Sequence, residues 1–153
     1  MLDALEKSAF AQTIAQSQMI TATLSALHVL GFAMVTSGAL LFGLRGLGRL
    51  FGERPPVDVT KPAVRAVTLG ACMNIVTGAL MFSPRAASAL ANGFFRAKML
   101  LLASAILAQL LVARRLVRRS REDQGGFPAL AAAACAALWL GVGLAGAAFI
   151  LIE

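Results

Sequence analysis

The stretch MITATLSALHVLGFAMVTSGALLF, residues 19–42, is a long apolar run that carries no charged side chain and one histidine, His28. A bilayer core about 30 Å thick needs roughly 20 apolar residues per helix, so this run is long enough to cross it. Three further runs of similar length follow, at residues 63–82, 94–113 and 127–152. The sequence therefore predicts an all-α polytopic membrane protein with four transmembrane helices in an up-down bundle.

The rest of the chain agrees with this organisation. Hydrophobic residues make up 59% of the sequence, where a soluble domain is usually about half apolar. Prolines 55, 56 and 62 argue against a continuous helix before residue 63. Apolar residues at helical spacing near the start predict an amphipathic interfacial helix over residues 1–16, which precedes a four-helix transmembrane domain over residues 17–153.

The charges are unevenly distributed along the chain, which has a net charge of +7 from 14 basic and 7 acidic residues. Most cations lie in the first and third loops, and only Lys7, Arg85, Arg96 and Lys98 lie on the other side. The positive-inside rule then predicts a bacterial inner membrane protein with both termini in the periplasm. This arrangement of cations beside membrane helices argues against a nucleic-acid partner.

The third loop carries the densest group of cations, and these are expected to contact anionic membrane lipids. They are Arg114, Arg115, Arg118, Arg119 and Arg121.

A few polar side chains fall inside the apolar runs, where they usually face a bundle interior. At about 100° per residue, His28 shares a stripe with Val35 and Ala39. Asn74 and Thr77 lie at a matching depth in the second run, and Lys98 lies near the start of the third. We therefore expect His28, Asn74, Thr77 and Lys98 to share one polar pocket toward the outer face.

Three interpretations of this pocket remain open. In the first, His28 hydrogen-bonds Asn74 or Thr77 and fixes the packing. In the second, His28 is the metal ligand of a b-type haem, because imidazole is a common axial ligand. Met73, Met81 or His28 of a second copy would then supply the sixth ligand, and Lys98 would meet a propionate. The third is a path for Cu(I) through methionines and cysteines. Cys72 and Cys135 are otherwise expected to be small buried residues.

Several function classes lack their signatures in this sequence. No Asp or Glu lies within an apolar run, and Glu153 follows the fourth run, whereas a proton-coupled carrier usually needs a carboxylate inside the membrane. Phosphate loops, HExxH motifs and dinucleotide fingerprints are also absent from the sequence, so no catalytic residue is assigned. The run 127–152 is rich in Ala and Gly, which favours close packing against neighbouring helices or another subunit.

Three segments together resemble an uncharacterised family of bacterial four-helix membrane proteins. They are LHVLGFAMVTSGALLFGLRGLG, NIVTGALMF and FFRAKMLLLASAIL, within about residues 13–115. More distantly, the layout is similar to the membrane domain of copper resistance protein D and to bacterial membrane-bound protoporphyrinogen oxidase. The latter resemblance implies a haem-linked histidine at His28 and a matching lysine at Lys98. The tryptophan and arginine that follow the histidine in the oxidase are missing here, so oxidase activity is not expected.

The leading hypothesis is a redox or b-haem-associated membrane subunit that uses His28 as its sole imidazole ligand. The alternative is a haem-free accessory, structural or assembly subunit of a larger membrane complex or homo-oligomer, formed through the fourth helix. A copper-handling or small-molecule transport protein is the third.

Overall fold

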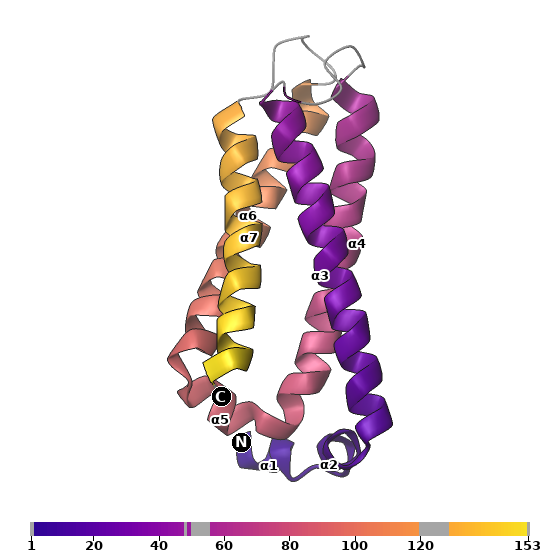
Figure 1. Cartoon of the computed structure of the whole chain (residues 1–153), viewed down its shortest axis with the longest axis vertical. Coiled ribbons are helices and arrows are strands. Elements are labelled where there is room, and N and C mark those ends of the chain that lie inside the picture. Colours follow the sequence, from indigo (N-terminus) through magenta and orange to yellow (C-terminus); the bar gives the residue numbers. More distant parts are fainter. Residues whose placement is uncertain (1, 48, 50–55, 120–128, 153) are drawn as a thin grey trace.

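The computed structural model describes residues 2–47, 49, 56–119 and 129–152, and these residues are helical and contain no strand. Four long helices run side by side in alternating directions (Figure 1). They are α3 (Gln18–Gly46), α4 (Pro56–Phe82), α6 (Gly93–Arg119) and α7 (Ala129–Ile152). Short helices cover one end of the bundle: α1 (Leu2–Glu6), α2 (Ala9–Gln16), the 3-10 turn η1 (Ser83–Arg85) and α5 (Ala86–Ala91).

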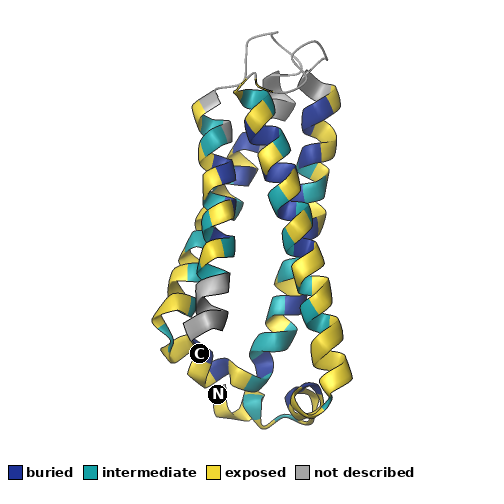
Figure 2. Ribbon diagram, in the orientation of Figure 1, coloured by how far each residue is buried: buried dark blue, intermediate teal, exposed yellow. Residues whose placement is uncertain are grey.

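Three helical segments among the described residues are long and apolar enough to cross a membrane: Gln18–Gly46, Asp58–Ala91 and Gly93–Val112. The apolar stretch described in α7, Ala133–Gly146, is shorter. Only 33%, 28% and 17% of the three spanning windows are buried inside the molecule. Exposed positions cover the outside of the bundle (Figure 2), and many of them are leucines and valines. An apolar exterior of this kind is what a helix bundle presents to lipid.

Side-chain caps set several helix ends. The Ser17 side chain accepts a hydrogen bond from the Ile20 amide at 3.4 Å, and α3 starts directly after it. Asn92 Oδ1 accepts from the Phe94 amide at 2.8 Å at the start of α6. Each cap satisfies a backbone donor that has no partner within its own helix. The segment between the second and third apolar runs forms η1 and α5.

Helices α3 and α4 form the closest packed pair in the bundle. A Cβ atom built on Gly31 would lie 3.0 Å from the Gly70 carbonyl oxygen, and one on Gly38 would lie 2.7 Å from the Ala63 carbonyl oxygen. Only glycine allows the two backbones to approach this closely, as in other membrane helix pairs. The seam residues recur at spacings of three and four along both helices, which keeps one face of each helix against the other.

Helix α7 joins this pair to α6. The Phe32 ring of α3 lies over Gly143, where a side chain on α7 would collide with it. A Cβ atom on Gly146 would lie 3.3 Å from the Lys98 Nζ atom of α6, a looser approach. Among the described residues, α3 packs on α4 and α7, and α7 packs on α6, whereas α4 and α6 meet chiefly where the Phe82 and Phe95 rings stack, with centroids 5.5 Å apart. The bundle is therefore two helix pairs that meet mainly through α3 and α7.

The best-packed part of the core lies between these pairs. Its largest fully buried side chain is Trp139, which is 2% exposed. Val35, Ala39, Val67, Ala105, Cys135 and Val142 complete this buried cluster. Val35 and Ala39 are the two residues that the helical wheel places on the His28 stripe, so their burial confirms that this stripe faces inward.

Some helix bounds differ from the predicted ones. α4 begins at Pro56 rather than residue 63 and contains Pro62. Pro62 has no backbone N–H, so the helix lacks one backbone hydrogen bond at this position. Because Pro62 lies near the start of α4, the rest of the helix keeps its hydrogen bonds. α6 continues past the apolar run to Arg119, because hydropathy marks the membrane-length part of a helix and not its end.

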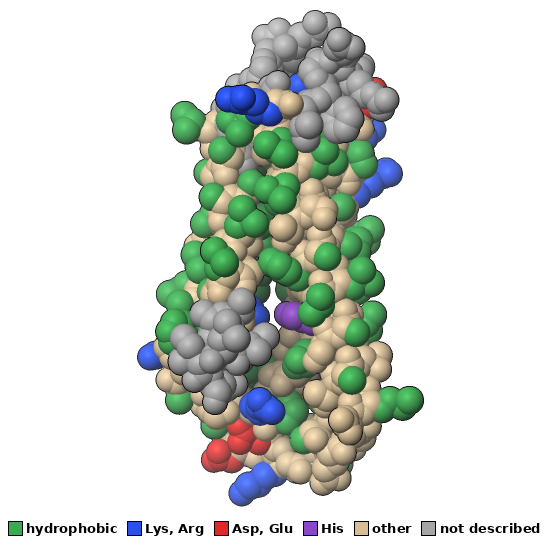
Figure 3. Space-filling view, viewed as in Figure 1, with side chains coloured by type: hydrophobic (Ala, Val, Ile, Leu, Met, Phe, Trp, Pro, Cys, Tyr) green, Lys and Arg blue, Asp and Glu red, His purple; other side chains and the backbone are tan. Residues whose placement is uncertain are grey.

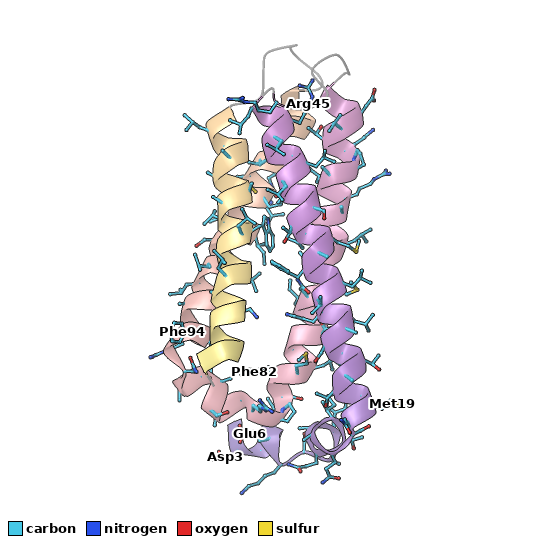
Figure 4. All side chains as sticks on the ribbon, viewed as in Figure 1. Asp3, Glu6, Met19, Arg45, Phe82 and Phe94 are labelled. Carbon is cyan, nitrogen blue, oxygen red and sulfur yellow. The ribbon has the colours of Figure 1, made fainter. Side chains whose placement is uncertain are left out.

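The N-terminal segment forms two short helices where the sequence predicts one. The Ser8 hydroxyl accepts a hydrogen bond from the Ala11 amide at 3.2 Å and starts α2 there. The side chains of Ala11 and Ile14 are buried, and α2 packs on α3, α4 and η1. A carboxylate oxygen of Glu6 accepts a hydrogen bond from the Ala87 amide at 2.7 Å, which ties α1 to α5. Asp3 and Glu6 lie at this end of the molecule and Arg45 at the opposite end (Figure 4).

Candidate ligand site at His28

The bundle is hollowed between its two helix pairs, on the side nearer to α1 and α2. Figure 3 shows this opening, with the single histidine of the chain in its wall. His28 is partly exposed although it lies in the middle of a membrane-length helix. An imidazole at this depth that faces an opening in the bundle is a functional candidate.

The hydrogen bonds of Thr77 define the state of the His28 ring. The Thr77 hydroxyl donates to the Met73 carbonyl oxygen at 2.7 Å, one turn back in α4. Its oxygen lies 2.7 Å from His28 Nδ1. Because the only hydroxyl proton points to Met73, the Nδ1 atom carries the proton in this contact and donates it to Thr77. Neutral His28 is therefore protonated at Nδ1, and its Nε2 atom keeps a free lone pair.

No described residue hydrogen-bonds the Nε2 atom. A Cβ atom on Gly78 would lie 3.3 Å from His28 Cε1, so the ring lies close against a bare part of the α4 backbone. A ligating histidine usually donates its other ring proton to a fixed acceptor, and this orients the ring and its lone pair. His28 and Thr77 show that arrangement.

Asn74 lies against the backbone of α3 at the same level. With its amide oriented to satisfy both groups, the nitrogen donates to the His28 carbonyl oxygen at 2.6 Å, and the oxygen accepts from the Phe32 amide at 3.2 Å. Gly31 makes this approach possible, since a Cβ atom there would lie 2.6 Å from the end of the Asn74 amide group. Asn74 therefore fixes the segment of α3 that carries the histidine.

Lys98 reaches the same space from α6. Its Nζ atom would lie 3.3 Å from a Cβ atom on Gly146, so the chain crosses the face of α7 at a glycine. Gly146 is one turn from Gly143, which the Phe32 ring covers, so Lys98 lies near the level of the α3 segment that carries His28. No carboxylate among the described residues pairs with this ammonium group. The structure thus brings together His28, Thr77 and Asn74, and Lys98 lies against α7 at Gly146.

The two methionines expected as sixth ligands lie on α4, one turn before and one turn after Thr77. The backbone carbonyl of Met73 receives the Thr77 hydroxyl, and its side chain is partly exposed. Met81 lies one turn beyond Thr77 in α4 and is also partly exposed. Within the described part of the chain, no group of three or more His, Cys, Asp or Glu side chains could hold a metal ion. A metal at this site would therefore depend on His28 for its only strong protein ligand.

A second polar group lies deeper in the bundle and was not predicted as a site. The Cys135 thiol of α7 donates to Gln109 Oε1 of α6 at 2.9 Å, and both residues are buried. One feature of the sequence could have indicated this group: on a helical wheel, Gln109 lies on the same stripe as Lys98. Burial of Cys135 agrees with expectation, whereas Cys72 is exposed on the outside of α4. Hydropathy alone does not separate a lipid-facing cysteine from a buried one.

The five arginines of the third loop are only partly described. Arg114 is exposed near the end of α6. Arg115, Arg118 and Arg119 belong to the same helix, but the positions of their side chains are outside the described set. Arg121 lies outside the described residues altogether.

Comparisons with protein-family models, with curated proteins and with solved structures each gave no match. The candidate site is therefore interpreted from its own geometry.

Proposed function

We propose that this chain is a bacterial inner-membrane subunit that binds a b-type haem in the opening beside His28 and takes part in electron transfer. The observation that carries the proposal is the fixed ring of His28. Its Nδ1–H donates to Thr77 at 2.7 Å, and this leaves the Nε2 lone pair available to a metal.

The surroundings of His28 suit a planar, largely apolar group with an acidic edge. The opening shown in Figure 3 separates α3 and α4 from α6 and α7. Lys98 supplies a cation that has no carboxylate partner among the described residues, and a haem propionate would provide one. A charge at this depth is costly unless it is paired, so an anionic substituent would be bound strongly there.

When bound, haem would supply a one-electron redox centre. The protein's own residues would do three things. His28 would hold the iron, Thr77 would keep the imidazole in the ligating tautomer, and Lys98 would orient the acidic edge. Asn74 would keep the backbone of residue 28 at a fixed distance from α4, since its amide contacts the His28 carbonyl.

The absorption spectrum tests this proposal. Protein expressed with ample haem and purified in mild detergent should show a Soret band and sharp bands on reduction. His28→Ala should lose these bands and still insert in the membrane. Ser25→Ala, a change in the same helix, should keep them. A colourless wild-type protein that does not change when haem is added would contradict the proposal.

A haem-free accessory or assembly subunit is the second candidate, and one observation favours it. His28 and Asn74 join α3 to α4 through hydrogen bonds that would stabilise the pair without any ligand. In that case His28→Asn should be mild, because a polar contact between membrane helices contributes only about 0.6 kcal/mol on average. The same spectrum decides between the two functions.

We further propose that all four long helices cross the membrane and that both termini face the periplasm. The alternating directions of α3, α4, α6 and α7 support this (Figure 1). So do the positions of the cations, since α3 and α6 end on the side of the bundle opposite to α1 and α2, and the cation-rich stretches of the sequence follow these two ends.

A further inference from the structure

The core cluster contains two buried N–H groups that have no acceptor. Gln109 is 7% exposed and Trp139 is 2% exposed. Neither Gln109 Nε2 nor Trp139 Nε1 has a hydrogen-bond partner among the described residues. Buried polar groups are nearly always paired, and a donor without a partner in a membrane core is especially unfavourable.

The two donors lie on the same side of the α6–α7 pair. Gln109 meets Cys135 through the contact of its Oε1 atom with the thiol. Trp139 is one turn along α7 from Cys135, and both belong to the buried cluster that includes Ala105 of α6. Gln109 is one turn from Ala105 on α6. The helical register thus places the Trp139 indole about one helical turn from the Gln109 amide, on the same buried face.

The chemistry of the neighbouring groups defines what is missing. The Gln109 oxygen accepts a hydrogen bond from the Cys135 thiol, and the Gln109 NH₂ group is left without an acceptor. An indole nitrogen can only donate. The buried hydroxyl of Thr36 in α3 also lacks a partner. It faces α7 one turn beyond Phe32, the residue whose ring lies over Gly143. The cluster therefore offers donors to a group that the protein itself does not supply.

We propose that Gln109 and Trp139 together bind an oxygen acceptor in the core of the bundle. Two sources fit this chemistry: a trapped water molecule, or the carbonyl oxygen of a small membrane-soluble ligand such as a quinone. The site lies deeper than His28 on the far side of Phe32, and it does not depend on whether haem is bound.

Trp139 is the only tryptophan in the chain, so its spectra report on this site alone. The first measurement is ultraviolet resonance Raman spectroscopy of the indole N–H in purified protein, with and without menadione as the quinone probe. The second is quenching of Trp139 fluorescence by menadione. Gln109→Met removes the amide with little change of volume. Gln109→Asn keeps the amide but moves it closer to the α6 backbone, because the side chain is one methylene shorter. Ser104→Ala, at an exposed position of α6, is the matched control.

A trapped water predicts a hydrogen-bonded indole without menadione, and this signature should be lost in Gln109→Met and weakened in Gln109→Asn. A quinone-type ligand predicts that the signature appears only with menadione, together with saturable quenching. Its half-saturation should rise at least tenfold in Gln109→Met and stay unchanged in Ser104→Ala. An indole that is not hydrogen-bonded under either condition would overturn the proposal. So would a hydrogen-bonded indole that is unaffected by Gln109→Met.

Discussion

His28 Nδ1 and Thr77 Oγ1 lie 2.7 Å apart, and the Thr77 hydroxyl proton is committed to the Met73 carbonyl. This pair joins the two most closely packed helices of the bundle and determines which nitrogen of the imidazole stays free. The predictions below test this pair, the helix packing and the placement of the chain in the membrane.

Thr77→Val should weaken haem binding by about 10- to 100-fold, the usual effect of removing the partner of a ligating histidine. The nearly isosteric valine removes the acceptor for Nδ1–H and lets the ring adopt its other tautomer. Titration of haem into the purified variant measures the change. Thr77→Ser keeps the hydroxyl and should bind like the wild type. Equal affinities for the valine and serine variants would show that Thr77 does not orient His28.

Lys98→Gln should lower haem affinity and shift the reduction potential, because it removes a positive charge near the metal. Lys98→Arg should preserve most of the affinity. Potentiometric titration of the reduced bands measures both effects. Arg96→Gln is the control, since Arg96 is exposed in the same helix. If Lys98→Gln leaves both the potential and the affinity unchanged, Lys98 extends to the lipid headgroups instead of the ligand.

Gly31→Ala should destabilise the α3–α4 pair by about 1–3 kcal/mol, the usual cost of overpacking. A Cβ atom there would lie 2.6 Å from the end of the Asn74 amide group, which is hydrogen-bonded to α3, and 3.0 Å from the Gly70 carbonyl oxygen. Thermal unfolding in detergent measures the effect. Gly93→Ala is the matched control because nothing lies within 4 Å of a Cβ atom at that position. Equal melting temperatures for the two variants would rule out a tight glycine seam.

A reporter that is active only in the periplasm should be active when fused after Glu153 and silent when fused between residues 114 and 121. The expected result follows from the cations that flank α6. Both fusions must be expressed at equal levels, which immunoblotting checks. The reverse pattern would show the opposite orientation in the membrane, with the His28 opening toward the cytoplasm.

Replacement of Arg118, Arg119 and Arg121 with glutamine should reduce the anionic lipid that co-purifies with the protein. Each cation near the headgroups contributes about 1 kcal/mol. Mass spectrometry of the bound lipids measures the loss, and Lys7→Gln at the opposite end serves as the control. An unchanged lipid content would leave these arginines with a role in orientation only.

The sequence was enough to predict the long helices and the grouping of the site residues. A run such as 19–42 fixes a membrane-length helix, and a polar residue within it has few favourable positions except the interior. His28 and Thr77 could therefore be matched by depth and by helical stripe before their contact was known.

The finer features depend on how two backbones meet. The contact of Asn74 with the backbone of residues 28 and 32 requires Gly31 to lie beside it, and no single helix reveals that pairing. The Gln109–Cys135 contact depends in the same way on the register of α6 against α7. The helix break at Ser8 reflects a local cap that competes with a weak amphipathic pattern.

The Asn74 amide also restricts how the bundle can move. It is matched to one carbonyl and one amide of α3, so sliding α4 by a turn would break both contacts and press Gly70 against larger side chains. Piston-like motion within this pair is therefore blocked. Because α4 and α6 meet among the described residues chiefly at the stacked Phe82 and Phe95 rings, the remaining freedom is a swing of the α6–α7 arm about that stack and its contact with α3. Such a swing would change the width of the opening and leave the imidazole in place.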